Sequence, residues 1–205
     1  MVIDRPFRRY LKESLRDNIC YKCHNGEVGV KLLELVKYLI ILIRLGLENR
    51  NVFREGVTIS RSTGQDQETV VGNRTYWFAN SHAGHNARIG DEVILVNGTL
   101  VAGHCTIGRG AILPANGTIH QFTWVGEKVM FQGVASAGMH VPPYVMCAQV
   151  NNVVAINSVG LRRSEEITAE DRKQIKEAFQ ITYGSGLKLR EALEKMDACT
   201  DWGAA

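Results

Sequence analysis

Apolar and small side chains recur every six residues through the middle of the chain. From Val71 to Phe131 every sixth residue is apolar or small, and each residue two positions earlier is small or β-branched. The first set is Val71, Trp77, Ala83, Ile89, Leu95, Val101, Ile107, Leu113, Ile119, Val125 and Phe131. The second set is Thr69, Thr75, Ser81, Ala87, Val93, Thr99, Cys105, Ala111, Gly117, Thr123 and Val129. This is the hexapeptide signature of a parallel β-helix, in which three short strands make one coil.

The repeat also predicts which side chains face the interior. Each coil buries one apolar side chain at every corner, and stacked coils share one continuous core. We therefore expect at least four coils, with Ile89, Ile107 and Val125 stacked inside. The pattern fixes the period of the coil but not its handedness.

Three histidines fall near one edge of the predicted β-helix. Three six-residue steps make one coil and lead from His85 to position 103, beside His104, and one further coil leads to position 122, near His120 and Gln121. Stacked strands lie about 4.8 Å apart, so one ligand could contact successive coils. A single histidine is more often a surface or hydrogen-bonded polar group than a catalyst. Three histidines in adjacent coils predict a shared site.

The six-residue pattern stops near residue 140. Pro142 and Pro143 cannot donate to a strand ladder, which predicts that the strands end there. Thr168, followed by acidic residues, predicts a helix N-cap, and the helix should end at 183–186. Residues 187–196 restart a helical period, with Leu189, Ala192, Leu193 and Met196 on one face. The simplest interpretation is a small helical domain that caps the last coil.

The start of the chain has a different character. Residues 31–47 follow a helical pattern, and the apolar run 32–47 contains Glu34, Lys37 and Arg44. That run is shorter than a membrane span of about 20 residues and predicts a buried or interfacial helix. No signal peptide is apparent, so we expect a cytoplasmic protein. We predict a helical N-terminal segment over 1–48, the β-helix over 49–148 and a helical domain over 149–205.

Composition and cysteines exclude several classes of function. Apolar residues make up 45% of the chain, charged residues 22%, and the net charge is +3, which is too mild to indicate nucleic-acid binding. Five cysteines without an export signal indicate free thiols. Cys20, Cys23 and His24 match a haem-attachment motif, but such proteins are exported, and zinc would need a second ligand pair. We expect no cofactor and no metal.

Five segments have a distinctive sequence: SHAGHNARIG, LVAGHCTIG, TIHQFTWVG, GVASAGMHVPPYVM and INSVGLRRSEEIT. Over roughly residues 46–197, these segments resemble the UDP-N-acetylglucosamine O-acyltransferase family of lipid A biosynthesis. The resemblance implies a left-handed parallel β-helix with a C-terminal helical domain, assembled as a homotrimer with active sites between subunits. Few charges among the outward positions of residues 93–125, and a histidine row that needs a second wall, also favour a trimer.

The activity that the resemblance implies is transfer of an (R)-3-hydroxyacyl group from acyl carrier protein to the 3-hydroxyl of UDP-N-acetylglucosamine. A sugar hydroxyl needs a base, and histidine titrates near neutral pH. By motif position His85 corresponds to the general base and Gly103 to the oxyanion-binding N–H. Gly133 corresponds to the acyl-length ruler, where a glycine leaves room for a longer chain. The substrate-binding positions are His82, His104, His120, Gln121, Asn157, Arg162 and Arg163.

The chain departs from the family pattern at several positions. Asn86 follows the second histidine, where the family has an aspartate, and Val159 replaces an acidic residue. The remaining departures are Ala83 and Gly84 between the two histidines and Ser164 in place of a basic residue. Family members carry further coils before the stretch that matches residues 49–61, whereas residues 1–45 do not follow the hexapeptide pattern. Two alternatives stay open: the related glucosamine N-acyltransferase, and a catalytically silent β-helix that binds carrier protein.

Overall fold

The structure of the 205-residue chain is a computed structural model. The structure describes residues 45–47, 50–64, 67–199 and 202. It divides into two compact units, of which the first ends at Val154 and the second begins at Ala155. Each unit is described by itself.

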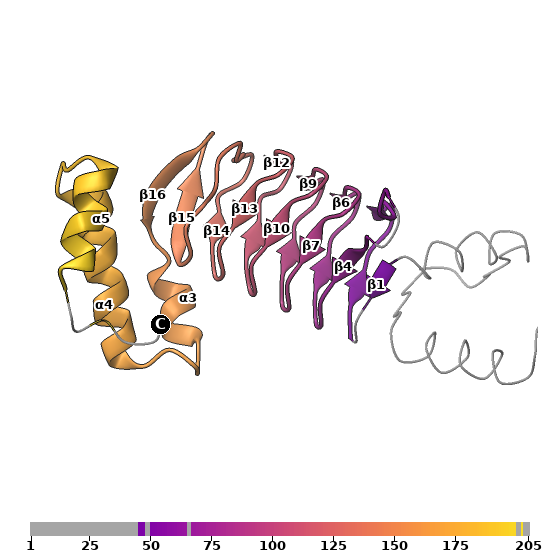
Figure 1. The fold of residues 1–205 in the computed structure, drawn as a ribbon. Helices are drawn as coiled ribbons and strands as arrows, with labels where there is room; N and C mark the ends of the chain where they lie inside the picture. Colours follow the sequence, from indigo (N-terminus) through magenta and orange to yellow (C-terminus); the bar gives the residue numbers. More distant parts are fainter. Residues whose placement is uncertain (1–44, 48–49, 65–66, 200–201, 203–205) are drawn as a thin grey trace, which may run out of the picture. The chain divides into compact units, whose positions relative to one another are not determined.

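The first unit is a β-helix whose short strands lie side by side in successive coils (Figure 1). One sheet has the order β1 (Leu45–Leu47), β4 (Thr69–Val71), β7 (Arg88–Ile89), β10 (Thr106–Ile107) and β13 (Trp124–Val125). The second has the order β16 (Asn152–Ile156), β15 (Val145–Ala148), β14 (Met130–Phe131), β11 (Ile112–Leu113), β8 (Ile94–Leu95), β5 (Tyr76–Trp77) and β2 (Val52–Phe53). The third has the order β12 (Thr118–Ile119), β9 (Leu100–Val101), β6 (His82–Ala83) and β3 (Thr58–Ile59).

The interior matches the six-residue pattern of the sequence. Ile107 of β10 pairs in parallel with Ile89 on one side and with Val125 on the other, and all three side chains are buried. The residues two positions earlier, such as Thr69 and Val129, are also buried. Five strands in one sheet correspond to four successive coils, so the prediction of a parallel β-helix is confirmed.

Each coil turns at residues with left-handed backbone angles, with φ between 51° and 66° at the three corners. The corner between the first and second sheets has Arg74, Glu92, Gly110 and Lys128 at this position. The corner between the second and third sheets has Asn80, Gly98, Asn116 and Val134. The corner that returns to the first sheet has Asn86, His104 and Phe122. Since the same turn recurs once in every coil, outward side chains at a corner form vertical rows.

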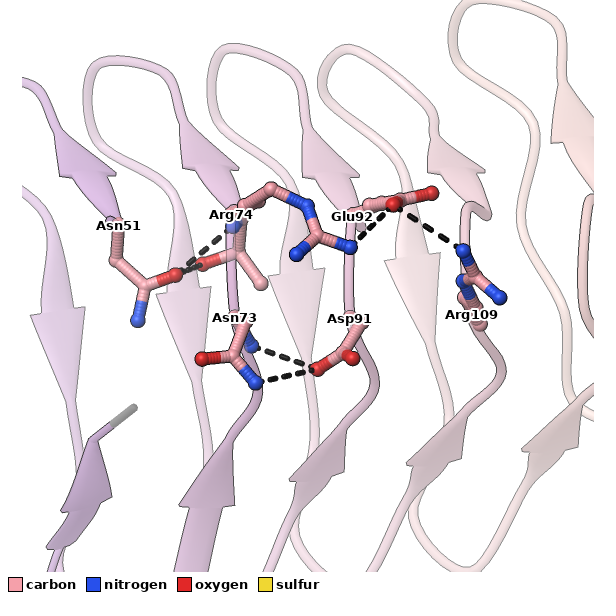
Figure 2. Close-up of polar contacts among 7 residues, drawn as sticks. Asn51, Asn73, Arg74, Asp91, Glu92 and Arg109 are labelled. Carbon is pink, nitrogen blue, oxygen red and sulfur yellow. Dashed lines mark hydrogen bonds and ion pairs between the residues drawn. The ribbon is translucent and has the colours of Figure 1, made fainter. Parts of the chain in front are cut away.

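Polar side chains of the first row bind one another across successive coils (Figure 2). Asp91 Oδ1 accepts hydrogen bonds from the backbone N–H of Asn73 at 2.7 Å and from its side-chain amide at 3.3 Å. Glu92 lies between two arginines, with Oε1 2.5 Å from a guanidinium nitrogen of Arg74 and 3.3 Å from one of Arg109. We call these five residues the charged corner.

The first coil is longer than the next ones. Leu47 pairs with Val71, and Val71 pairs with Ile89, so the first of these coils contains one extra six-residue step. The extra step lies between β3 and β4. The helix predicted over 31–47 is wrong for residues 45–47, which form strand β1. Six-residue steps lead from position 47 to 53 and 59, so this strand belongs to the β-helix register. The rest of the predicted helix lies outside the described residues.

The β-helix continues past Pro142 and Pro143, contrary to the sequence prediction. Val141 forms a bridge with Val125, and Phe131 of β14 pairs with Cys147 of β15. In both pairs the two partners are separated by fewer residues than the three six-residue steps of a regular coil. This coil is therefore shortened. The prolines occupy its turn, where no ladder N–H is required, and they pack closely over the preceding coil. A Cβ on Gly126 would collide with the backbone of Pro143.

The second unit is helical. It contains α3 (Ser158–Arg163), α4 (Ala169–Phe179), a π-helical turn η1 (Gln180–Gly184) and α5 (Leu189–Asp197). Thr168 caps α4 as predicted, through a reciprocal capping box with Asp171. In the described part of the helical unit, the buried apolar side chains are Leu161, Ile167, Ile181 and Ala192. Leu189 and Leu193, on the predicted apolar face of α5, are exposed.

Candidate active site

Three turns of the corner between the third and first sheets carry the predicted site. His85 and Asn86 lie between β6 and β7, and Gly103 and His104 lie one coil further, between β9 and β10. Backbone hydrogen bonds fix this register, because the N–H of His104 donates to the carbonyl of His85 at 2.9 Å. The N–H of Phe122 donates to the carbonyl of Gly103 at 3.1 Å. We call this row the histidine corner.

Aromatic rings at the histidine corner contact one another. The ring of His104 meets the ring of His85 edge to face, with centroids 5.1 Å apart, and stacks on Phe122 at 4.8 Å. Phe122 is 62% exposed, so the stack presents an open aromatic face. The sequence prediction did not include Phe122, although it lies one full coil after His104 and shares its backbone conformation. That spacing is the signal that could have identified it.

One ring nitrogen of His85 is held by neighbouring side chains. Nδ1 lies 2.9 Å from Oδ1 of Asn86 and 3.3 Å from Oγ1 of Thr63. With Nδ1 engaged, Nε2 is the nitrogen that can take a proton from a substrate. The backbone of Gly103 lies against this side of the ring, because a Cβ there would lie 2.9 Å from Cε1 and from Nε2. Any larger residue at position 103 would therefore displace the His85 ring.

The amide of Gly103 is also free to act. Within the described part of the chain, its N–H donates no hydrogen bond to another residue. An unpaired backbone N–H beside a potential base is suited to stabilising a developing oxyanion. His85 and Gly103 therefore lie together, as the sequence predicted. Their chemical roles stay predictions.

His82 lies on β6, before the corner. Its Nδ1 is 2.8 Å from Oγ1 of Thr58, which belongs to the preceding coil. Burial lowers the pKa of the His82 imidazole, and a hydrogen bond with Thr58 opposes that shift. The net effect favours the neutral ring, which can accept or donate one hydrogen bond to a polar ligand.

His120 and Gln121 are exposed in the next coil, where Nδ1 of His120 lies 3.2 Å from the carbonyl oxygen of Gln121. They share the corner with His85 and His104, as predicted. Gly133 lies elsewhere, at the corner between the second and third sheets. A Cβ on Gly133 would meet nothing within 4 Å, so the space around it is open.

Three predicted substrate-binding residues belong to the helical unit. Asn157 is buried and caps α3, where its Oδ1 accepts a hydrogen bond from the N–H of Gly160 at 3.0 Å. Arg162 and Arg163 are exposed in the last turn of the same helix. Asn157 therefore has a local structural role, while the two guanidinium groups are available to an anion.

Neither a metal cluster nor a membrane helix occurs in the described ranges. They contain no group of three or more His, Cys, Asp or Glu side chains able to hold a metal ion, and no helix with the length and apolar character of a membrane span. The Cys20, Cys23 and His24 motif lies outside these ranges. Cys105 and Cys147 are free, buried thiols, and burial raises the pKa of Cys147 to about 11.

Comparison with known proteins identifies sequence relatives. Residues 140–202 match the family described as UDP N-acetylglucosamine O-acyltransferase, domain 2. The acyl-[acyl-carrier-protein]–UDP-N-acetylglucosamine O-acyltransferase of Pseudomonas entomophila is 38% identical over 157 residues, which cover 75% of this chain and 60% of the relative. The enzyme of the same name from Gloeothece citriformis is 34% identical over 164 residues, covering 80% and 59%.

Solved structures agree with these relatives. The UDP-N-acetylglucosamine acyltransferase of Bacteroides fragilis is similar with a TM-score of 0.68 and 36% identity, over 75% of this chain and 60% of that one. The chain spans about 60% of the length of the curated relatives that it matches. By sequence and by fold over the matched residues, the chain belongs to the UDP-N-acetylglucosamine O-acyltransferase family.

Proposed function

We propose that this chain transfers an (R)-3-hydroxyacyl group from acyl carrier protein to the 3-hydroxyl of UDP-N-acetylglucosamine, the first step of lipid A biosynthesis. The contacts around the His85 ring are the main support for this proposal. His85 is held through Nδ1 by Asn86 and Thr63, while the other side of its ring lies against Gly103. A base nitrogen beside an unpaired backbone N–H is what attack of a hydroxyl on a thioester requires.

The reaction follows from these two groups. Nε2 of His85 takes the proton of the sugar hydroxyl as its oxygen attacks the thioester carbonyl carbon. The carbonyl oxygen becomes an oxyanion and accepts a hydrogen bond from the N–H of Gly103, a contribution of about 3 kcal/mol in well-studied enzymes. The intermediate then collapses, the carbon–sulfur bond breaks, and the carrier thiolate takes the proton from His85. No cofactor enters this sequence.

The other predicted residues have binding or supporting roles in this proposal. His82, His104, His120 and Gln121 bind the nucleotide sugar or the acyl chain, and Arg162 and Arg163 bind nucleotide phosphates. Asn157 caps the helix that carries the arginines. Open space around Gly133 favours a longer acyl chain. Replacing Gly133 with methionine should then shift the preferred carrier substrate towards shorter chains.

We also propose a homotrimer, with sites between subunits. Large apolar side chains are exposed at and beside the histidine corner, namely Leu100, Phe122 and Trp124. Exposed apolar patches of this kind are typical of interfaces, and a second wall would turn the row into a cleft. Sedimentation should give three times the chain mass. A stable monomer at micromolar concentration would contradict the assembly.

The decisive experiment supplies the purified chain with 3-hydroxyacyl carrier protein and UDP-N-acetylglucosamine, and follows the acylated nucleotide sugar by mass spectrometry. The expected product is an ester, which hydroxylamine cleaves. A hydroxylamine-stable amide formed from an amino-sugar acceptor would indicate the N-acyltransferase instead. Carrier binding without either product would indicate the catalytically silent alternative.

A further inference from the structure

Asn86 connects His85 to residues of the preceding coil. Its Oδ1 lies 3.0 Å from the backbone nitrogen of Thr63, 3.0 Å from Oγ1 of Thr63 and 2.9 Å from Nδ1 of His85. Its Nδ2 lies 3.3 Å from the carbonyl oxygen of Thr63 and 2.5 Å from Oε1 of Gln67. Asn86 is only 9% exposed, so its amide depends on these partners rather than on water.

The backbone of Thr63 determines which way this amide points. A backbone N–H can only donate and a backbone carbonyl can only accept, and Thr63 presents one of each to the two ends of the Asn86 side chain. Rotating the amide by half a turn would face donor with donor and acceptor with acceptor. The oxygen of Asn86 is therefore the atom that faces His85.

The acceptor at this position determines which nitrogen of the His85 imidazole carries the hydrogen. Since Oδ1 of Asn86 accepts at 2.9 Å, Nδ1 of His85 must carry the hydrogen, and the lone pair lies on Nε2. Thr63 Oγ1 adds a second acceptor to the same N–H once its own hydrogen is donated to Asn86. The imidazole is thus prepared in the tautomer that a general base at Nε2 requires.

We propose that Asn86 is a positioning residue whose amide, oriented by Thr63 and Gln67, fixes the Nδ1–H tautomer of His85. The role of the tautomer in catalysis rests on the proposed function, but the tautomer itself does not. The contacts also explain why an amide, rather than a carboxylate, occupies position 86. An aspartate would place a carboxylate oxygen against the carbonyl of Thr63, where Asn86 now donates.

Nitrogen NMR of the full chain, labelled at histidine and measured near pH 8, tests the proposal. The His85 signals are assigned by their loss in His85→Gln. The unmodified chain should show Nδ1 protonated and Nε2 unprotonated. Asn86→Ala should convert a large fraction of His85 to the Nε2–H tautomer, and should lower kcat at least tenfold while KM changes less than threefold.

A matched pair at Gln67 separates positioning from folding, because Gln67 is exposed and contacts Asn86 rather than His85. Gln67→Ala removes the acceptor and should raise the Nε2–H fraction, whereas Gln67→Glu retains an acceptor oxygen and should keep Nδ1–H. An Nε2–H tautomer in the unmodified chain, or an unchanged tautomer in Asn86→Ala, would overturn the proposal. Absence of acyl transfer would contradict the proposed function. The tautomer measurement would still decide the role of Asn86.

Discussion

Two corners of the same β-helix share a backbone and differ in what their side chains bind. At the charged corner, Asp91 and Glu92 are engaged by Asn73, Arg74 and Arg109 of neighbouring coils (Figure 2). Both corners recur once in every coil and use left-handed turn residues. At the charged corner both carboxylates are held by side chains of neighbouring coils. Such a ladder stabilises the stack and leaves little with which to bind a ligand.

The histidine corner is arranged differently. Its rings contact one another, and among the described residues neither Nε2 of His85 nor the N–H of Gly103 has a hydrogen-bond partner. Phe122 is exposed beside them. The geometry of the coil therefore does not by itself determine which corner is functional. A corner becomes a candidate site when its side chains fix one another's orientation without using up their reactive atoms.

The largest expected effect comes from the core that both corners share. Ile107 is 1% exposed and stacks between Ile89 and Val125, so Ile107→Ala should lower the free energy of unfolding by about 2–5 kcal/mol. Urea unfolding followed by circular dichroism, at one fixed protein concentration, measures this loss. Thr118→Ala, at an outward position, is the control and should change stability by less than about 0.5 kcal/mol. Equal losses from both would contradict the inward register.

Substitutions at and beside the histidine corner should act mainly on catalysis. His85→Ala should lower kcat at least 100-fold, or about 2.7 kcal/mol in the barrier, because the sugar hydroxyl loses its proton acceptor. His82→Ala should produce a smaller loss, mainly in kcat/KM, because a neutral His82 is proposed to bind substrate. Steady-state kinetics of both variants provide the test. Equal mild effects would refute the assignment of His85 as the base.

The charged corner should show the reverse behaviour. Glu92→Gln should leave kcat unchanged and lower the free energy of unfolding by at most about 1 kcal/mol, since the carboxylate and both guanidinium groups are partly exposed. Arg74, and then Arg109, lowers the pKa of Glu92, with burial opposing them. The stabilisation is therefore present above the ordinary glutamate pKa and lost as pH falls through the lowered one. Unfolding at pH 7 and pH 3 should differ less in Glu92→Gln than in the unmodified chain.

Most of the β-helix could be predicted because the core imposes the pattern. Inward positions such as Val71 and Ile107 must be apolar in every coil, so their spacing appears directly in the sequence. The shortened coil at Pro142 and Pro143 was missed because a turn without a ladder N–H accepts proline as readily as other residues. Strand β1 was missed because its surroundings in sequence have a helical period.

The site could be predicted only in part, since outward residues carry no such constraint. The vertical alignment of His85 and His104 follows from the coil period. The chemical roles proposed for them follow from the family resemblance. The contacts of Asn86 with Thr63 and Gln67 depend on the extra six-residue step between β3 and β4. No periodicity specifies the conformation of such an insertion, so its hydrogen bonds become visible only in three dimensions.

The smallest expected effect concerns proton binding beside the histidine corner. Burial lowers the pKa of His82 in the folded chain, with Thr58 opposing the shift, whereas an unfolded histidine titrates near pH 6.5. Above that pH the ring is neutral in both states, and His82 adds no pH dependence. Below it, the unfolded chain binds a proton that the folded chain resists, so the free energy of unfolding falls until the pH passes below the lowered pKa. His82→Gln removes this contribution, and the difference in urea midpoints between the two proteins from pH 7.5 to pH 5 isolates it from the other groups. Parallel curves would mean that His82 is as accessible to protons as any surface histidine. The contrast between the half-buried position of His82 on β6 and the open histidine corner would then have no effect on proton binding.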